Sequence, residues 1–143
     1  MTPEDSVDAL VDALVRTTFQ VTGMLTRLGA ENDLSLTQIR VLGILRDRRP
    51  RLTELAAYLG VDKSSMSGLI DRAERRGLVA RDRNPHDARA VDVYLTPAGQ
   101  ELIQRLFAEG RRALAPAIGR LPPEQREQLI GLLDTVLEPG NDQ

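Results

Sequence analysis

The N-terminal part of the chain carries apolar side chains at helical spacing, which predicts a long amphipathic helix over residues 5–28. Gly29 to Asp33 is expected to break this helix. Ser35 and Gln38 then form a capping-box pattern that opens a second helix, which is expected to end before Pro50. The apolar positions of the first helix are Val7, Leu10, Val11, Leu14, Val21, Leu25 and Leu28.

Two shorter helices follow, separated only by the residues "GVD". Thr53 can cap the first, "ELAAYLG", which Gly60 is placed to end in a left-handed conformation. Asp62 can cap the second, "KSSMSGLIDRAERRG", which closes at Gly77. Because so short a turn makes two helices cross steeply, the pattern predicts a helix-turn-helix whose second helix protrudes.

The protruding helix has one apolar face and one small, polar face. Its apolar positions fall at i, i+3, i+4 and i+7, the spacing of a buried stripe: Met66, Leu69, Ile70 and Ala73. Ser64, Ser67, Gly68, Asp71 and Arg75 lie largely away from that stripe. The N-terminal half of this helix is therefore expected to meet solvent or a partner.

The segment after Gly77 alternates in the manner of a β-hairpin. The runs "LVARD" and "AVDVYLT" flank "RNPHD", which predicts a two-stranded wing attached to the helix-turn-helix. Thr96 and Pro97 start another helix, expected to reach about Gly119, and "LPPEQ" opens a last one.

These elements predict a mainly α fold of the winged-helix type (α+β), with residues 1–143 as one domain. Residues 34–96 form the winged helix-turn-helix lobe, and residues 1–33 and 97–143 form a helical dimerisation region. The terminal helices have more leucine-rich surface than one small lobe can cover, so a second copy of the chain is expected against them. The alternative is a monomer whose terminal helices fold over the lobe as a cap.

Composition narrows the possible chemistry. The chain has no cysteine and a single histidine, His86, so neither disulfides nor a thiolate or histidine-rich metal site is expected, and no cofactor is implied. No apolar run is long enough to cross a membrane and no signal peptide is evident, so a cytoplasmic location is expected. No G-x-S-x-G, P-loop or dinucleotide-binding glycine pattern occurs, so we do not expect an enzyme.

The net charge of −2 hides an uneven distribution. Residues 34–90 hold twelve Lys and Arg against seven Asp and Glu, whereas both flanking regions are acidic. A basic middle between acidic ends is typical of a segment that meets a polyanion, although clustering of surface charge by chance is the alternative.

The residues of this basic segment suggest two kinds of DNA contact. Phosphate contacts are expected from Lys63, Arg72, Arg75, Arg81 and Arg83. Ser64, Ser65, Ser67 and Gly68 occupy the part of the protruding helix that can enter the major groove and reach base edges. The alternative for the serines is that they only cap and solvate the start of the helix.

The wing tip combines Asp87 with Arg89. We interpret Arg89 as a guanidinium inserted into the minor groove, with Asp87 bracing it through a charge-assisted hydrogen bond. An exposed ion pair that contributes little is the alternative. His86 is expected to be a solvated loop residue in contact with phosphate at most.

The few aromatic and thioether side chains are candidates for an effector pocket. Phe19, Met24, Tyr58 and Phe107 could line a space where the first, second and fifth helices approach the lobe. Each could equally belong to the core.

The run from Leu52 to Leu102 resembles the multiple-antibiotic-resistance regulator (MarR) family of bacterial winged helix-turn-helix proteins. "ELAAYLGVDKSSMSGLIDRAERRGLV" is similar to the family's helix-turn-helix, and "LSLTQIRVLGIL" is similar to its second helix. The wing signature D-x-R-x-x-x-V-x-L-T-x-x-G is present as Asp87, Arg89, Val93, Leu95, Thr96 and Gly99.

The resemblance covers about residues 34–105 and implies a homodimer that binds a pseudo-palindromic operator on double-stranded DNA, more often as a repressor than an activator. It also implies release by a small lipophilic or phenolic molecule. Ala73 in place of leucine and Pro122 in place of a polar cap depart from the family pattern, and Ser67 with Gly68 offers few long side chains for reading bases. A helical dimer that serves as a protein-interaction module without DNA binding remains the alternative function.

Overall fold

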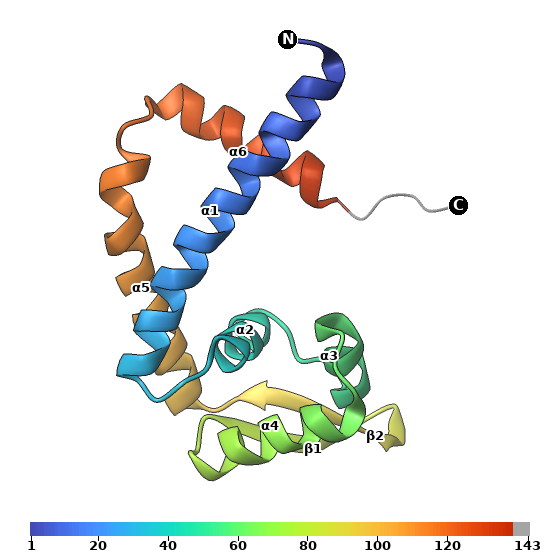
Figure 1. Ribbon diagram of the computed structural model, residues 1–143. Coiled ribbons are helices and arrows are strands. Elements are labelled where there is room, and N and C mark those ends of the chain that lie inside the picture. The colour runs from blue at the N-terminus through green and yellow to red at the C-terminus, as the bar shows by residue number, and fades with distance from the viewer. Residues whose placement is uncertain (139–143) are drawn as a thin grey trace.

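The computed structural model describes residues 1–138, which form six helices and one antiparallel pair of strands (Figure 1). The last five residues of the expected 97–143 region lie outside the described part. The elements are α1 (Pro3–Glu31), α2 (Leu36–Leu45), α3 (Leu52–Leu59), α4 (Lys63–Arg75), β1 (Val79–Asn84), β2 (Asp87–Leu95), α5 (Pro97–Ile118) and α6 (Pro123–Leu137).

Helix α1 is longer than the sequence pattern predicted. Thr2 and Asp5 form a capping box at its start, and the helix continues through Gly29 to Glu31. Gly29 is therefore not a helix breaker. A Cβ at this position would lie 2.5 Å from the carbonyl oxygen of Leu34 and 2.8 Å from Cδ1 of Ile39, so glycine allows a close approach between α1 and the start of α2.

The predicted capping box of α2 is confirmed. The backbone N–H of Gln38 donates to Oγ of Ser35 at 3.1 Å, and the Ser35 N–H donates to Oε1 of Gln38 at 2.7 Å. The predicted cap of α3 is wrong, because the helix already begins at Leu52 and Thr53 lies inside it; Arg51 occupies the N-cap position without a side-chain hydrogen bond.

The turn between α3 and α4 matches the prediction in detail. Gly60 ends α3 with a φ of 68°, and Gly77 follows α4 with a φ of 74°. Asp62 caps α4, accepting from the Ser65 N–H at 2.7 Å. The helix-turn-helix is thus held by local interactions at both ends of α4.

The wing is longer than the two runs recognised in the sequence. Strands β1 and β2 pair in a register that joins Val79 to Leu95 and Asn84 to Asp87, with an irregularity after Arg83. A hydrogen bond of 2.9 Å from the Val93 N–H to the Pro50 carbonyl ties the chain between α2 and α3 to β2. The wing is therefore fixed at its base to the rest of the lobe.

The predicted start of α5 is confirmed. Oγ1 of Thr96 accepts from the Gly99 N–H at 3.1 Å, and Pro97 takes the first position of the helix. At the start of α6, Pro122 holds the N-cap position and supplies no side-chain hydrogen bond, as its departure from the family pattern led us to expect.

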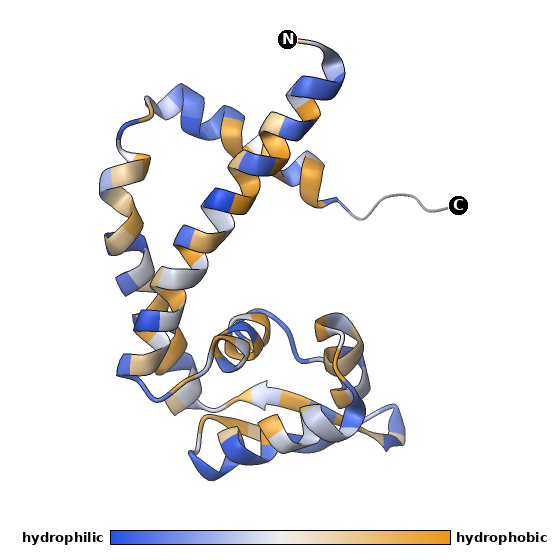
Figure 2. Ribbon diagram, viewed as in Figure 1, coloured by the Kyte–Doolittle hydropathy of each residue, from blue (hydrophilic) through white to orange (hydrophobic). Residues whose placement is uncertain are grey.

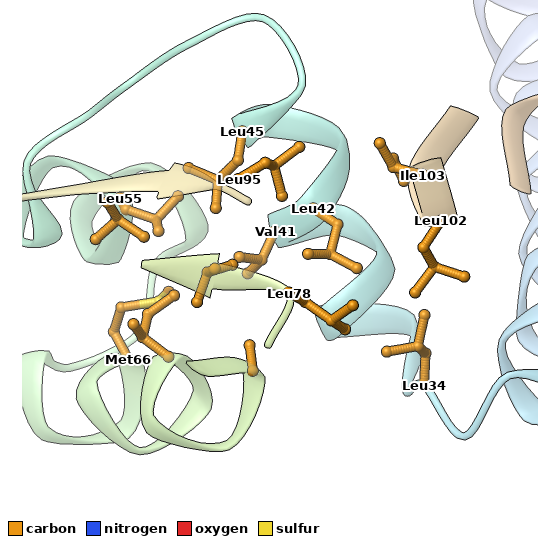
Figure 3. Close-up of a cluster of buried hydrophobic side chains, with 14 of the residues drawn as sticks. Leu34, Val41, Leu42, Leu45, Leu55, Met66, Leu78, Leu95, Leu102 and Ile103 are labelled. Carbon is orange, nitrogen blue, oxygen red and sulfur yellow. The ribbon is translucent and has the colours of Figure 1, made fainter. Parts of the chain in front are cut away.

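One hydrophobic core joins the lobe to α5 (Figure 3). Met66 and Ile70 on α4 are fully buried, Ala73 is buried and Leu69 is half-buried, so the predicted inner face of the protruding helix is essentially confirmed. The buried side chains come from α2, α3, α4, both strands and α5, and include Leu42, Leu55, Val79, Val93 and Ile103.

Helices α1 and α5 lead away from the lobe, and α6 lies at their far end (Figure 1). The monomeric alternative would require the terminal helices to cover the lobe. Helix α6 does not cover it, and α6 has no buried residue. Apolar residues on α6 and on the N-terminal half of α1 remain exposed (Figure 2). Within residues 1–138, no helix is long and apolar enough to cross a membrane.

Candidate DNA-binding surface

The N-terminal half of α4 presents a polar surface next to the wing. Lys63, Ser64 and Ser65 are exposed, whereas Ser67 and Gly68 are half-buried. The Ser65 hydroxyl donates to Oδ2 of Asp62 at 2.8 Å, so this serine acts at least partly as a cap. The Ser64 side chain makes a weaker hydrogen bond to the same carboxylate. In the described structure the Ser67 hydroxyl makes no hydrogen bond to Asp62, which leaves it better placed to meet a ligand.

The capping carboxylate is strongly engaged. Hydrogen bonds from the Ser65 backbone N–H and then from its hydroxyl lower the pKa of Asp62 below its ordinary value of 3.8. The ionised carboxylate also lies at the positive end of the α4 dipole, where a negative charge is favoured. Asp62 is therefore charged at neutral pH and fixes the first turn of α4.

Several predicted phosphate contacts have exposed side chains. Arg72 and Arg75 lie in the last turn of α4, Lys63 lies in its first turn, and Arg83 lies on β1. Arg83 pairs in the strand register with Val91, near the wing tip. These four cations flank the polar half of α4 from both ends and from the wing.

Arg81 does not have the free side chain that a phosphate contact needs. Its Nη2 is bonded to a carboxylate oxygen of Asp71 and donates to the Ser67 carbonyl at 3.3 Å, and its Nε lies 3.6 Å from Oε2 of Glu74. The side chain is 26% exposed. Because β1 passes directly beside α4, this arginine fastens the wing to the helix instead of pointing outward.

The wing turn also differs from the prediction. Oδ1 of Asp87 accepts from the backbone N–H of Arg89 at 3.0 Å, and no ion pair joins the Asp87 carboxylate to the Arg89 guanidinium in the described structure. Oδ1 of Asn84 accepts from the N–H groups of His86 and Asp87 at 2.9 and 3.1 Å. Asp87 therefore shapes the backbone of the turn, and the exposed side chain of Arg89 is left unbraced.

Sequence reasoning missed Arg49, in the linker between α2 and α3. Its guanidinium lies 4.1 Å from the centre of the Tyr94 ring and 3.8 Å from carboxylate oxygens of both Asp82 and Asp92. Asp92 is buried and also accepts from Nδ2 of Asn84 at 2.9 Å. The only sequence signal was the basic run "RDRRPR", which gives charge but not partners.

A large groove lies between α1, α2 and α5, with a volume of about 1210 Å³. Of the four candidate residues, Met24, Tyr58 and Phe107 line this groove, whereas Phe19 does not and is 72% exposed. Most of the lining is aliphatic, and three arginines reach it from different helices or loops: Arg40, Arg48 and Arg111. In the described part of the chain, no cluster of His, Asp or Glu side chains could hold a metal ion.

Comparison with known proteins identifies this architecture. A family model described as "MarR family" matches residues 32–90, which span α2 to the wing. The uncharacterised helix-turn-helix transcriptional regulator YkoM of Bacillus subtilis is 31% identical over 104 residues, or 72% of this chain and 68% of that protein. The homoprotocatechuate degradative operon repressor of Escherichia coli is 27% identical over 136 residues, or 94% of this chain and 91% of that protein.

Solved structures share the fold over nearly the whole chain. A MarR family protein from Bacillus stearothermophilus superposes with a TM-score of 0.84 at 23% identity, covering 95% of this chain and 96% of its own. A MarR mutant from E. coli complexed with operator DNA superposes with a TM-score of 0.72 at 24% identity, covering 96% and 99%. The match to the family model, the identity to YkoM and the winged helix-turn-helix itself agree: the chain belongs to the MarR family of transcriptional regulators.

Proposed function

We propose that the chain acts in the cytoplasm as a homodimeric repressor that occupies a pseudo-palindromic operator and leaves it when a small amphipathic ligand binds. The observation that carries the DNA part is the outer side of the N-terminal half of α4, which is polar and lies next to a wing that carries the exposed arginines Arg83 and Arg89. MarR family regulators bind DNA and are not enzymes. The family therefore supports the same reading as the surface.

In this proposal, α4 enters the major groove and the wing follows the adjacent minor groove. Ser64 and Ser67 approach base edges, and Arg89 at the wing tip reaches into the minor groove, where narrow A/T-rich tracts concentrate negative potential. Lys63, Arg72, Arg75 and Arg83 supply the phosphate contacts, which set affinity and its salt dependence. Arg81 is removed from this group because its charge is already paired.

Exposed apolar faces on the terminal helices support the homodimer. On α1, Val7, Leu10 and Val11 are each at least 52% exposed. On α6 the exposed side chains are Leu129, Ile130, Leu132, Val136 and Leu137. A patch of this kind marks an interaction site, and a second copy of the chain would bury both helices in one symmetric interface.

The groove between α1, α2 and α5 supports ligand control. Its aliphatic wall with Phe107 and Tyr58 suits an aromatic ring, and the arginines around it suit a carboxylate or phenolate. It also lies between the proposed dimerisation helices and the lobe, so an occupant can alter how the two are placed. The E. coli relative named above represses an operon for degradation of homoprotocatechuate, an aromatic acid, which agrees with this ligand class.

Selection from random duplexes across a salt series tests the proposal. A DNA-reading dimer enriches a two-fold symmetric sequence, and its affinity falls steeply with salt as phosphate-bound counterions are released. If no sequence is enriched and the salt response is flat, the chain does not read DNA and the protein-interaction alternative stands. Ligand control is then tested by adding aromatic carboxylates to the selected complex and measuring release.

A further inference from the structure

The turn that follows α1 is tightly built. Oxygen of Gly29 accepts from the N–H groups of Asn32 at 3.0 Å and Leu34 at 2.8 Å, and Asp33 takes a left-handed conformation with a φ of 55°. Gly29 has no room for a Cβ beside the Leu34 carbonyl. The carbonyl groups of Asn32 and Asp33 are therefore held in fixed positions.

Arg76, at the C-cap of α4, bonds to both of these carbonyls. Its Nη1 donates to the Asp33 oxygen at 2.9 Å and its Nη2 donates to the Asn32 oxygen at 2.9 Å. The two contacts use different nitrogens of one planar group, so they fix the direction of the side chain as well as its distance. The last turn of α1 has no basic residue of its own, and Arg76 brings a positive charge to the negative end of that helix.

Helix α5 is attached to the same turn. Nη2 of Arg105 donates to Oδ1 of Asn32 at 3.0 Å, and Nδ2 of Asn32 donates to the Leu28 carbonyl at 2.9 Å. Asn32 thus receives arginines from α4 and α5 while bonding back to α1. The turn is the place where hydrogen bonds join the proposed base-reading helix directly to the helix that leads to the proposed dimer interface.

We propose that Arg76 is a positioning residue that determines which half-site spacing the dimer accepts. The inference rests on the proposed function, because spacing has meaning only for a dimer that reads two half-sites. Half-sites one helical turn apart are separated by roughly 34 Å, so the two copies of α4 must be held at a matching separation and angle. Each Arg76 fixes the C-terminal end of α4 to α1, and the N-terminal end remains free to meet the bases.

Arg75 is the matched control. It precedes Arg76 in the chain and carries the same charge, but its side chain is exposed and makes no hydrogen bond or ion pair in the described structure. If Arg75 contacts phosphate, its removal weakens binding to a single half-site and to a full site alike, and lowers the salt slope. If Arg76 only positions α4, its removal leaves half-site binding and the salt slope per lobe unchanged.

The DNA experiment uses the selected operator, the same operator with one to three base pairs inserted or removed at its centre, and a duplex with one half-site. For Arg76→Ala we expect operator affinity to fall roughly threefold to tenfold, because two charge-assisted hydrogen bonds are lost per protomer at an exposed site. The ratio of affinity for the selected operator to affinity for operators of altered spacing should fall by a similar factor. Affinity for the duplex with one half-site should stay within about twofold of the parent protein, which is about the error of such a measurement. Arg76→Lys keeps the charge but not the two-pronged contact, and should behave like Arg76→Ala for spacing.

A DNA-free measurement tests the same inference. The chain has no cysteine, so Ser64→Cys introduces one spin label per protomer at the exposed start of α4. Pulsed electron resonance on the dimer then reports the distance between the two copies of α4. We expect a broader or shifted distribution when Arg76→Ala is added, and no change when Arg75→Ala is added.

The outcomes separate the inference from the function on which it rests. An unchanged spacing preference with an unchanged label distance overturns the positioning role of Arg76. Equal losses on half-site and full site with a smaller salt slope also overturn it, because Arg76 would then be a phosphate contact. If the labelled parent protein gives no spin–spin distance between two protomers, or if selection enriches no symmetric operator, the proposed function itself has failed.

Discussion

Arg81 of β1 is ion-paired with Asp71 of α4, and its Nε also lies 3.6 Å from a carboxylate oxygen of Glu74. The pairing has two consequences for the candidate DNA surface. It fixes the base of the wing against α4, and it compensates two negative charges on the helix that would otherwise face a polyanion. An arginine that does not touch DNA can therefore still be necessary for binding it.

The first prediction follows from this pair. Arg81→Ala should weaken operator binding without reducing the slope of log affinity against log salt, because no phosphate contact is lost. Arg83 lies two residues after Arg81 on β1, nearer the wing tip, and its side chain is exposed. Arg83→Ala should therefore reduce the slope of log affinity against log salt by about 0.9 for each phosphate contact removed. Binding measured at four or more salt concentrations distinguishes the two.

A double-mutant cycle with Asp71→Ala checks the origin of the Arg81 effect. The coupling free energy between Arg81 and Asp71 in thermal or denaturant unfolding should be about 1 kcal/mol, since the pair is partly exposed. Additive effects of the two substitutions would mean that the pair contributes nothing to the wing's attachment.

The second prediction concerns the wing turn. Asp87→Asn should preserve operator affinity within about threefold, because an amide oxygen can still accept from the Arg89 N–H and keep the turn. Asp87→Ala removes that acceptor and should weaken binding further. Arg89→Ala should cost more than either, while the melting temperature stays nearly unchanged because its side chain is exposed. Loss of binding in Asp87→Asn as large as in Arg89→Ala would instead support a carboxylate that braces the guanidinium.

The third prediction uses the lowered pKa of Asp62. A carboxylate whose pKa is depressed in the folded state stabilises that state above its unfolded-state pKa, and the benefit disappears as the pH falls through the folded-state value. The parent protein should therefore be more stable than Asp62→Ala near neutral pH, and the difference should shrink below about pH 4. Thermal unfolding of both proteins from pH 3 to pH 7 measures it; a gap that does not change with pH would rule out the charged cap.

The fourth prediction addresses the proposed dimer. Ile130→Glu places a charge on the exposed apolar face of α6 and should convert the dimer to monomer at micromolar concentration, with operator affinity falling along with it. Glu124→Lys changes the charge at an exposed position that lies roughly 120° around α6 from Ile130, and it should leave the dimer intact. Sedimentation velocity gives the mass of each, and a dimeric Ile130→Glu protein would place the interface elsewhere.

The fifth prediction concerns the packing of α5 on the lobe. A Cβ at Gly99 would overlap the Leu78 carbonyl group, so Gly99→Ala should lower the free energy of unfolding by roughly 2–3 kcal/mol. Gly131 of α6 has open space around its Cα, and Gly131→Ala should raise stability by about 1 kcal/mol through helix propensity. Denaturant unfolding at one fixed protein concentration compares them, since a dimer's stability depends on concentration. If Gly99→Ala changes the free energy of unfolding no more unfavourably than Gly131→Ala, the close approach between Gly99 and the Leu78 carbonyl is contradicted.

Several starts and ends of the elements could be predicted from the sequence because their causes are local, whereas the predicted cap at Thr53 and the predicted break at Gly29 were wrong. The Ser35–Gln38 capping box, the Asp62 cap, the left-handed Gly60 and Gly77 and the Thr96–Pro97 start all depend on residues within four positions of one another. The buried face of α4 follows in the same way from the 3.6-residue period. These features sufficed to predict the winged helix-turn-helix. The family was indicated separately, by the resemblance of the helix-turn-helix run and of the wing signature from Asp87 to Gly99.

The partners of the arginines were decided by the tertiary structure alone. Arg81 pairs with a residue ten positions away, and Arg76 bonds to carbonyls 43 and 44 positions away, so no periodicity or short motif reveals either contact. A long, flexible cation looks the same in a sequence whether it is free for phosphate or held by a carboxylate, because only the fold brings the competing acceptor within reach. The sequence by itself thus determined which segment is basic and protruding. The packing of β1 against α4, and the position of the turn after α1 beside Arg76, decided which of its arginines remain free to bind.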